Sequence, residues 1–106
     1  MASVLIRPKA RREINAILVY YIETAGIGVA RGFRKAATET LRELAEFPQM
    51  GAPRKVRKPE FQGVRMWRVR GFESHLIFYV PRKDGIAVER VIHASQDYRR
   101  VLEASE

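Results

Sequence analysis

Two stretches with helical periodicity follow one another in this sequence, with only a few residues between them. Apolar residues line one helix face in the first stretch, at Ile14, Ile17, Leu18, Tyr21 and Ile22. The same spacing recurs in the second stretch, at Val29, Phe33, Ala36, Ala37, Thr40, Leu41 and Leu44. With breaks at Gly26 and Phe47-Pro48, the pattern predicts helices over about 8–24 and 28–47. Because the connection is short, we expect the helices to lie antiparallel and share an apolar seam.

Three segments in the second half are typical of strands. They cover residues 64–69, 75–80 and 86–93, and each is rich in β-branched and aromatic side chains. Gly71 separates the first two segments, and Asp84-Gly85, between the last two, is a strong hairpin signal. The three segments are therefore expected to form an antiparallel meander.

Two short elements are expected near the ends of the chain. Residues 3–7 are typical of a strand that ends at Pro8. Ser95 is a candidate N-cap for a short final helix, because its side-chain oxygen can accept a backbone hydrogen bond. Three side chains of that helix are expected to face inward: Tyr98, Val101 and Leu102.

These elements together predict an α+β fold. It has an N-terminal strand, an antiparallel helical hairpin packed on a small antiparallel β-sheet, and a short C-terminal helix. The hairpin covers one face of the sheet, and the opposite face is left without an assigned cover. With 106 residues, the chain has the size of one domain, which we place over residues 1–106.

The residue inventory excludes several classes of function. The sequence has no cysteine, which excludes a disulfide framework, a zinc ribbon and thiol catalysis. It has only two histidines and no nucleotide-binding glycine motif, so we expect neither a metal nor a cofactor. No apolar run approaches the roughly 20 residues that span a bilayer, and no secretory signal is recognisable. We therefore expect a cytoplasmic protein without a membrane partner.

The positive charge of the chain is concentrated in one region. The formal net charge is +8, and residues 54–70 hold seven basic residues against the single acid Glu60. The region covers the end of a segment expected to be an exposed basic loop, residues 48–63, and the strand that follows. A basic balance favours anionic partners: nucleic acid, acidic protein or anionic membrane. The arginines can either cover a solvent face or form a concave basic patch.

Alternation along the first strand of the meander leaves its orientation open. Arg65, Trp67 and Val69 point to one face of the sheet. The opposite set is Val64, Met66, Arg68 and Arg70. Because apolar and basic residues occur in both sets, either face can lie beneath the helices.

One enzymatic chemistry has a candidate inventory. Cleavage of RNA through its 2′-hydroxyl needs a base, an acid and cations that stabilise the phosphorane charge. Those groups could come from Arg65, Arg90, His93 and Tyr98. Arg90 and His93 are three positions apart, so alternation places them on opposite faces unless the strand ends or bulges near Ile92.

The order of several short motifs resembles a known family. The likeness begins with Arg7-Pro8-Lys9-Ala10 and is most specific from Gly63 onward. It continues through Gly71-Phe72-Glu73-Ser74-His75-Leu76-Ile77-Phe78-Tyr79, Asp84-Gly85-Ile86 and Arg90-Val91-Ile92-His93. In this order, over nearly its whole length, the chain resembles the ParE branch of the ParE/RelE toxin superfamily, the toxins of bacterial type II toxin–antitoxin pairs.

This resemblance implies a helical hairpin on a small antiparallel sheet, and it implies a function. ParE-like toxins inhibit DNA gyrase by protein–protein binding, whereas RelE-like relatives are ribosome-dependent mRNA endonucleases, which is the alternative here. In both groups a cognate antitoxin, ParD-like and acidic in the ParE case, wraps the toxin, and operator DNA is contacted only through the antitoxin.

The resemblance also has departures from the family pattern. Ala94-Ser95-Gln96-Asp97 stands where the family commonly has Gly, a small residue, Arg and Asp, and Val80 where an arginine is frequent. The lysines and C-terminal tyrosine of the ribosome-dependent members are not matched convincingly, which favours the gyrase reading.

On the gyrase reading no residue is catalytic, and the candidate residues bind a partner. Arginines supply charge complementarity, at Arg65, Arg68, Arg70 and Arg90. Aromatic side chains are the candidate anchors, because interface hot spots favour Trp, Tyr and Arg. They are Trp67, Phe72 and Tyr98.

Overall fold

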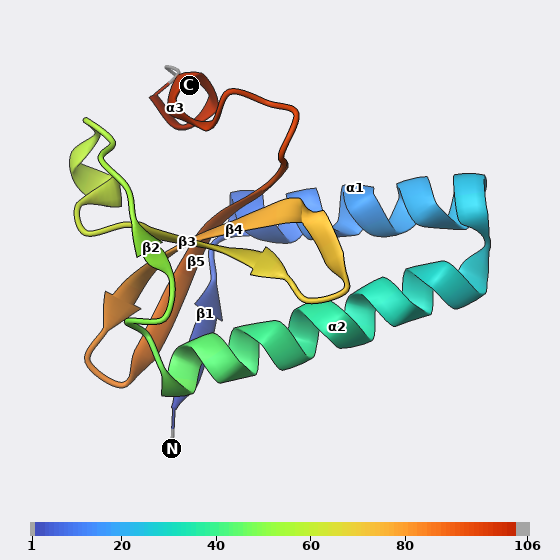
Figure 1. Cartoon of the computed structure of the whole chain (residues 1–106), viewed down its shortest axis with the longest axis horizontal. Coiled ribbons are helices and arrows are strands. Elements are labelled where there is room, and N and C mark those ends of the chain that lie inside the picture. The colour runs from blue at the N-terminus through green and yellow to red at the C-terminus, as the bar shows by residue number, and fades with distance from the viewer. Residues whose placement is uncertain (1, 104–106) are drawn as a thin grey trace.

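The predicted α+β fold is present in the computed structural model, which describes residues 2–103 (Figure 1). The helices are α1 (Pro8–Ala25), α2 (Ile27–Glu46), a single 3₁₀ turn η1 (Pro59–Phe61) and α3 (Tyr98–Glu103). The strands are β1 (Ser3–Ile6), β2 (Ala52–Pro53), β3 (Arg65–Val69), β4 (Phe72–Arg82) and β5 (Gly85–His93). Apart from β2 and η1, each of these elements was expected from the sequence, with small differences at the ends.

The two long helices form the expected antiparallel hairpin. α1 begins at Pro8, which fits the first helical turn because the amide hydrogen that proline lacks would have no partner there. Gly26 alone separates the helices, and its φ of 94° lies in the region that glycine adopts without steric cost. Figure 1 shows the tip of this hairpin extending past the end of the sheet.

The sheet has the strand order β1-β5-β4-β3-β2 and is mixed. The meander β3-β4-β5 is antiparallel, as predicted, and β2 adds antiparallel to the start of β3. β1 instead pairs parallel to β5, from Ser3 beside Gly85 to Ile6 beside Val88. The expectation of a wholly antiparallel sheet is therefore corrected at this edge, where the pairing joins segments some 80 positions apart.

β5 contains one extra residue relative to β4. The pairs on either side of it are Phe78 with Arg90 and Tyr79 with Val88. Glu89 is the extra residue, and such a bulge reverses the alternation of side chains, so Val88 and Val91 both face the hairpin. Because the bulge lies before Arg90, it leaves Arg90 and His93 on opposite faces, as simple alternation predicts.

Apolar side chains fill both faces of the sheet. The first core, between the hairpin and the sheet, contains Ala10, Phe33, Ala37, Leu41, Leu44, Ala45, Val69, Ile77, Tyr79, Ile86, Val88 and Val91. The second core, on the opposite face, contains Phe61, Val64, Leu76, Phe78, Ile92 and Leu102. Segment 56–64 and α3 thus cover the face that had no assigned cover. Segment 48–63 is not simply an exposed loop, because Phe61 is only 7% exposed.

The two cores resolve the orientation of β3. Trp67 and Val69 pack against the first core, and Val64 and Met66 belong to the second. Both faces of this strand are therefore covered, which explains why apolar residues occur in both alternating sets.

α3 packs as predicted but begins differently. Leu102 is buried in the second core, and Tyr98 and Val101 pack against it. The residue before the helix is Asp97, whose carbonyl oxygen accepts the Val101 amide hydrogen at 3.0 Å. The prediction of a Ser95 cap was wrong, because its hydroxyl lies 2.8 Å from His93 Nδ1 instead.

Candidate interaction surface

The basic segment 54–70 does not form one patch. Arg54, Lys55 and Arg57 line a pocket beneath α3. Arg65 turns toward the segment that follows α2, and Arg68 and Arg70 line a groove at the sheet edge. Lys58 lines a further pocket, beside the start of α1, so the predicted concentration of charge is divided among four places.

Arg65 holds the segment between α2 and β2. Its Nη1 donates to the carbonyl oxygens of Gly51 at 2.6 Å and Gln49 at 3.1 Å. The buried Tyr79 hydroxyl accepts the Gly51 amide hydrogen and donates to the Pro48 carbonyl oxygen, both at 2.8 Å. Burial raises the pKa of Tyr79, which keeps this hydroxyl protonated as a donor. Arg65 thus has a structural role in addition to any contact with a partner.

An edge groove lies beside β3, with a volume of about 520 Å³. It is lined by Met50, Ala52, Met66, Trp67, Arg68, Arg70 and Glu73. β2 pairs only with the first two residues of β3, so the groove opens where the strand continues toward Val69. The groove brings together three of the predicted partner-binding residues, Trp67, Arg68 and Arg70, at the open edge of β3, where side chains of both sheet faces line it, two methionines among them.

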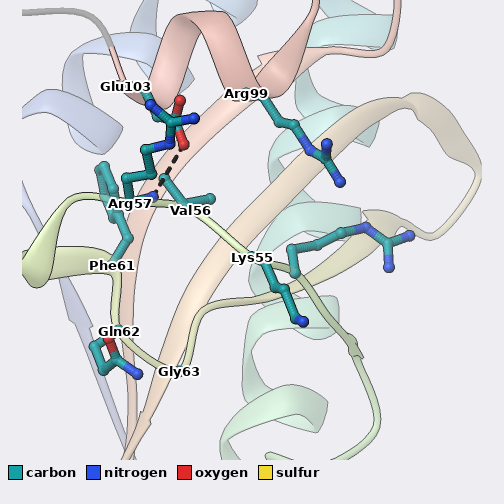
Figure 2. Close-up of a pocket in the computed structure, with 9 residues that line it drawn as sticks. Lys55, Val56, Arg57, Phe61, Gln62, Gly63, Arg99 and Glu103 are labelled. Atoms are coloured by element: carbon teal, nitrogen blue, oxygen red, sulfur yellow. Dashed lines mark hydrogen bonds between the residues drawn. The ribbon is translucent and has the colours of Figure 1, made fainter.

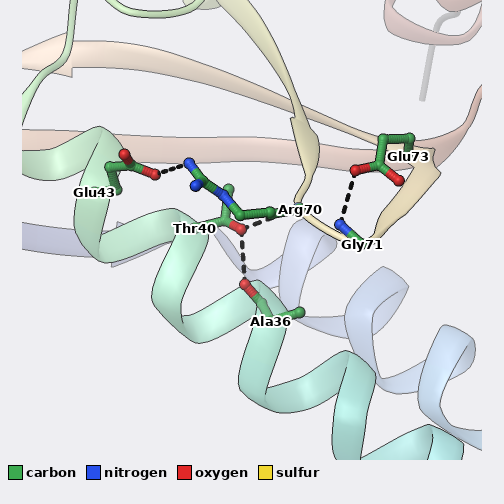
Figure 3. A network of polar contacts seen from close by, with 6 residues as sticks. All are labelled: Ala36, Thr40, Glu43, Arg70, Gly71 and Glu73. Atoms are coloured by element: carbon green, nitrogen blue, oxygen red, sulfur yellow. Dashed lines mark hydrogen bonds and ion pairs between the residues drawn. The ribbon is translucent and has the colours of Figure 1, made fainter.

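Arg70 also connects the turn after β3 to α2 through a hydrogen bond and an ion pair (Figure 3). Its backbone amide hydrogen is donated to the Thr40 hydroxyl at 3.2 Å, and that hydroxyl donates to the Ala36 carbonyl oxygen at 2.7 Å. Its guanidinium pairs with the Glu43 carboxylate. This network gives the buried Thr40 hydroxyl its partners and positions Arg70, which lines the edge groove.

Phe72 and Tyr98 lie on opposite faces of the sheet. Phe72 meets Phe33 edge to face, with ring centroids 5.4 Å apart, and packs against the first core. Tyr98 stacks on Phe78 of the second core at 5.2 Å. Both predicted anchors are thus largely used in internal packing, and they do not belong to one surface.

Arg90 forms a nearly buried ion pair with α1. Its Nε and Nη2 lie 3.0 and 2.7 Å from Glu13 Oε2, and Arg90 is only 8% exposed. Glu13 also accepts the Val91 amide hydrogen at 2.9 Å. Arg90 is therefore committed to holding α1 against β5, a role that the sequence did not indicate because Glu13 is 77 positions away.

His75 lies in an aromatic cluster of the first core. Its Nε2 is 2.7 Å from the Tyr21 hydroxyl, and its ring meets Phe33 edge to face at 5.2 Å. Nδ1 is buried and has no hydrogen-bond partner among the described residues. The His93 ring lies 5.6 Å away, and both histidines line the same pocket. Burial, with a smaller contribution from His93, lowers the pKa of His75.

This lowered pKa predicts a pH dependence of stability. Below its ordinary pKa of about 6.5, the unfolded His75 takes up a proton that the folded His75 resists. The free energy of unfolding is therefore expected to decrease as the pH falls below that value, down to the lowered pKa. Urea unfolding of the protein and of the His75→Gln variant between pH 7.5 and 5.5 gives the slope of the free energy of unfolding against pH. We expect a smaller slope in the variant, and equal slopes would contradict the assignment.

The four residues of the nuclease alternative each have different partners. Arg65 binds backbone carbonyls, and Arg90 binds Glu13. His93 lies beside His75 and Ser95 on the hairpin side, and Tyr98 stacks in the second core.

Within residues 2–103, no group of three or more His, Asp or Glu side chains is arranged to hold a metal ion. No helix in that range is long and apolar enough to cross a membrane.

The hairpin carries an exposed apolar tip that the sequence analysis did not predict. It consists of Val19, Tyr20, Ile22, Ile27 and Val29, each at least 39% exposed. Ile22 and Val29 have the spacing of the inward-facing set, but the hairpin continues past the end of the sheet (Figure 1), and these two side chains are 49% and 39% exposed. Several exposed large apolar residues close to one end of a helical hairpin are a candidate interaction site.

Comparison with known proteins identifies the family. The family described as ParE toxin of type II toxin-antitoxin system, parDE, matches residues 4–98. A chain in the structure titled "Chromosomal ParDE TA system from P. aeruginosa" has the same fold, with a TM-score of 0.69. It is 22% identical, and the match covers 88% of this chain and 96% of that chain. No curated protein sequence matches. The chain belongs to the ParE toxin family of type II toxin–antitoxin systems.

Proposed function

We propose that this toxin inhibits DNA gyrase by binding it as a protein, and that a cognate acidic antitoxin neutralises it. The observation that carries this proposal is the edge groove, which is lined by Trp67, Arg68 and Arg70 together with two methionines. Tryptophan and arginine are the residues that most often dominate binding energy at protein interfaces. The family match over residues 4–98 supplies the class of function.

The charge of Arg68 favours an acidic partner, because the guanidinium of Arg70, the other arginine of the groove, is already paired with Glu43. Arg68 donates to the Glu73 backbone carbonyl at 2.7 Å, a contact that orients its guanidinium without neutralising it. An acidic, amphipathic antitoxin segment could place carboxylates near Arg68 and apolar side chains on Trp67 and the methionines. The apolar hairpin tip offers a second contact area, so one chain lying across hairpin and sheet would cover both surfaces.

Several contacts support binding over catalysis. Arg90 is paired with Glu13, and Tyr98 is stacked against Phe78, so two members of the nuclease inventory have internal roles. Inhibition by binding requires no catalytic group, only an accessible surface, and the edge groove and hairpin tip are candidates for it.

A supercoiling assay with purified gyrase tests the target. We expect the toxin to abolish supercoiling at about micromolar concentration, and stoichiometric antitoxin to restore it. Unchanged supercoiling at a large excess of toxin, with no DNA-damage response on expression, would contradict the gyrase target. Codon-phased cuts in translated mRNA would instead support the endonuclease alternative.

A charge reversal in the groove tests the antitoxin contact. Arg68→Glu is expected to weaken antitoxin binding by about tenfold or more, because a like charge would face the acidic segment. Lys83→Glu, on the exposed turn between β4 and β5, is the matched control and should change affinity less than about twofold. Titration calorimetry compares the antitoxin affinities of the two variants, and their melting temperatures check that both are folded. Equal losses in both variants would contradict a specific role for the groove.

A further inference from the structure

A second concave surface lies on the sheet face away from the hairpin, between segment 54–63 and α3 (Figure 2). This basic pocket has a volume of about 550 Å³. Four of its lining residues are basic, Arg54, Lys55, Arg57 and Arg99, and one is acidic, Glu103. The pocket shares no lining residue with the edge groove.

The cations of the basic pocket come from two distant parts of the chain. Figure 2 shows Lys55 extending from the loop and Arg99 from α3. The single lining carboxylate, Glu103, uses Oε2 to accept the backbone amide hydrogen of Arg57 at 2.9 Å. Folding therefore gathers four positive charges around one negative charge, which is unfavourable unless solvent or a ligand compensates the excess.

The base of the pocket is held in place by the second core. Phe61 is buried in this core, and Val56 packs against the same core. Segment 54–63 is therefore anchored at two positions, residues 56 and 61. The Arg54 amide hydrogen is donated to the Val64 carbonyl oxygen, and that of Val64 to Phe61, both at 3.0 Å. The basic side chains thus project from a fixed backbone, which lowers the ordering cost of binding an anion.

The number and type of cations indicate the chemistry of the ligand. A single carboxylate is matched by one guanidinium, whereas the several oxygens of a phosphate group can accept from two or more. A volume of about 550 Å³ falls in the range of small-molecule sites. We propose that the basic pocket binds a phosphate-bearing ligand of nucleotide size, with its phosphate oxygens on Arg54, Lys55 and Arg99 and its apolar part over Val56.

Two sources share this chemistry: a free nucleotide and the phosphate backbone of a single-stranded oligonucleotide. Binding of ATP and inorganic phosphate by calorimetry, and of labelled RNA and DNA 12-mers by fluorescence anisotropy, distinguishes them. These measurements use the full chain without gyrase or antitoxin, so their failure is separate from failure of the proposed function. ATP binding supports the free nucleotide, and binding of the 12-mers alone supports the chain phosphates.

Variants of exposed residues identify the site. Lys55→Ala and Arg99→Ala are each expected to lower affinity about tenfold, the usual effect of losing one charge-assisted hydrogen bond. Arg31→Ala and Lys83→Ala, exposed and outside the pocket, should change affinity less than about twofold. For the oligonucleotides, each pocket variant should also reduce the dependence of log K on log salt by about one.

Two results would overturn the proposal. One is that neither ATP nor either 12-mer binds at millimolar concentration in low salt. The other is that the control variants lose as much affinity as Lys55→Ala and Arg99→Ala, because this would assign binding to the overall charge of +8 and not to the pocket. Both pocket residues are exposed, so unchanged melting temperatures will show that the variants fold.

Discussion

Gly85→Ala is expected to break the pairing of β1 with β5. Gly85 has a φ of 154° and lies directly beside Ser3. An alanine Cβ there would overlap the Ser3 carbonyl oxygen and would lie 2.7 Å from the Ser3 nitrogen and carbonyl carbon. These are backbone atoms of a paired strand, so they cannot move aside without loss of the pairing. We expect the free energy of unfolding to fall by about 3 kcal/mol or more.

Gly63→Ala is the matched control for that variant. Gly63 also has a positive φ, 80°, but a Cβ there would meet nothing within 4 Å. Its cost is therefore backbone strain alone, about 1 kcal/mol. Urea unfolding of both variants separates the steric overlap from the strain. Equal losses in the two variants would mean that the contact with Ser3 adds nothing.

Glu13→Ala is expected to destabilise the protein by about 3 kcal/mol. The variant removes both carboxylate oxygens that receive the Arg90 guanidinium and leaves that charge buried without its partner. It also removes the acceptor of the Val91 amide hydrogen. Unfolding in urea measures the loss. Glu23→Ala, an exposed carboxylate on the same helix, should change stability by less than about 0.5 kcal/mol.

A double variant separates the ion pair from the packing of its side chains. Glu13→Leu combined with Arg90→Met leaves neither charge behind and keeps apolar volume at both positions. It is expected to recover most of the stability lost in Glu13→Ala, because a buried ion pair is roughly balanced by the cost of desolvating it. If the double variant is as unstable as Glu13→Ala, the cost comes from packing or from the Val91 hydrogen bond.

The parts of the fold that depend on local patterns were predictable. The period of apolar residues defined both helices, and Asp84-Gly85 defined the turn between β4 and β5. Gly26 marked the boundary between α1 and α2 because a positive φ at that position needs no tertiary context. In each case neighbouring residues carry the whole signal, and the structure confirms the prediction.

The parts that depend on distant contacts were not predictable in the same way. Phe61 and Val56 are isolated apolar residues among basic ones, without a period that would indicate their burial in the second core. Parallel pairing of β1 needs a partner strand far along the chain. The cap of α3 was misassigned because Ser95 and Asp97 are both acceptable cap residues, and only the path of the chain decides between them.

The candidate surface was predicted in part for a similar reason. The sequence marked where positive charge gathers, and the structure places Trp67, Arg68 and Arg70 in one groove. The sequence could not indicate that Arg90 is paired with Glu13, because that contact joins residues 77 positions apart. The sequence also could not predict that the hairpin tip is exposed, because the helical period of apolar residues continues into the part of the hairpin that lies past the end of the sheet.

The parallel pairing of β1 with β5 also has a consequence during synthesis. β1 is made first, but its partner residues, Gly85–Val88, are made some 80 positions later. At synthesis rates of up to about 20 residues per second, that interval is about four seconds or longer. During this interval β1 has no partner strand, so the sheet is incomplete. β3 is synthesised before β5, and its surface is therefore present before the toxin is finished. The timing of translation, as much as affinity, sets when a partner can first bind a complete toxin.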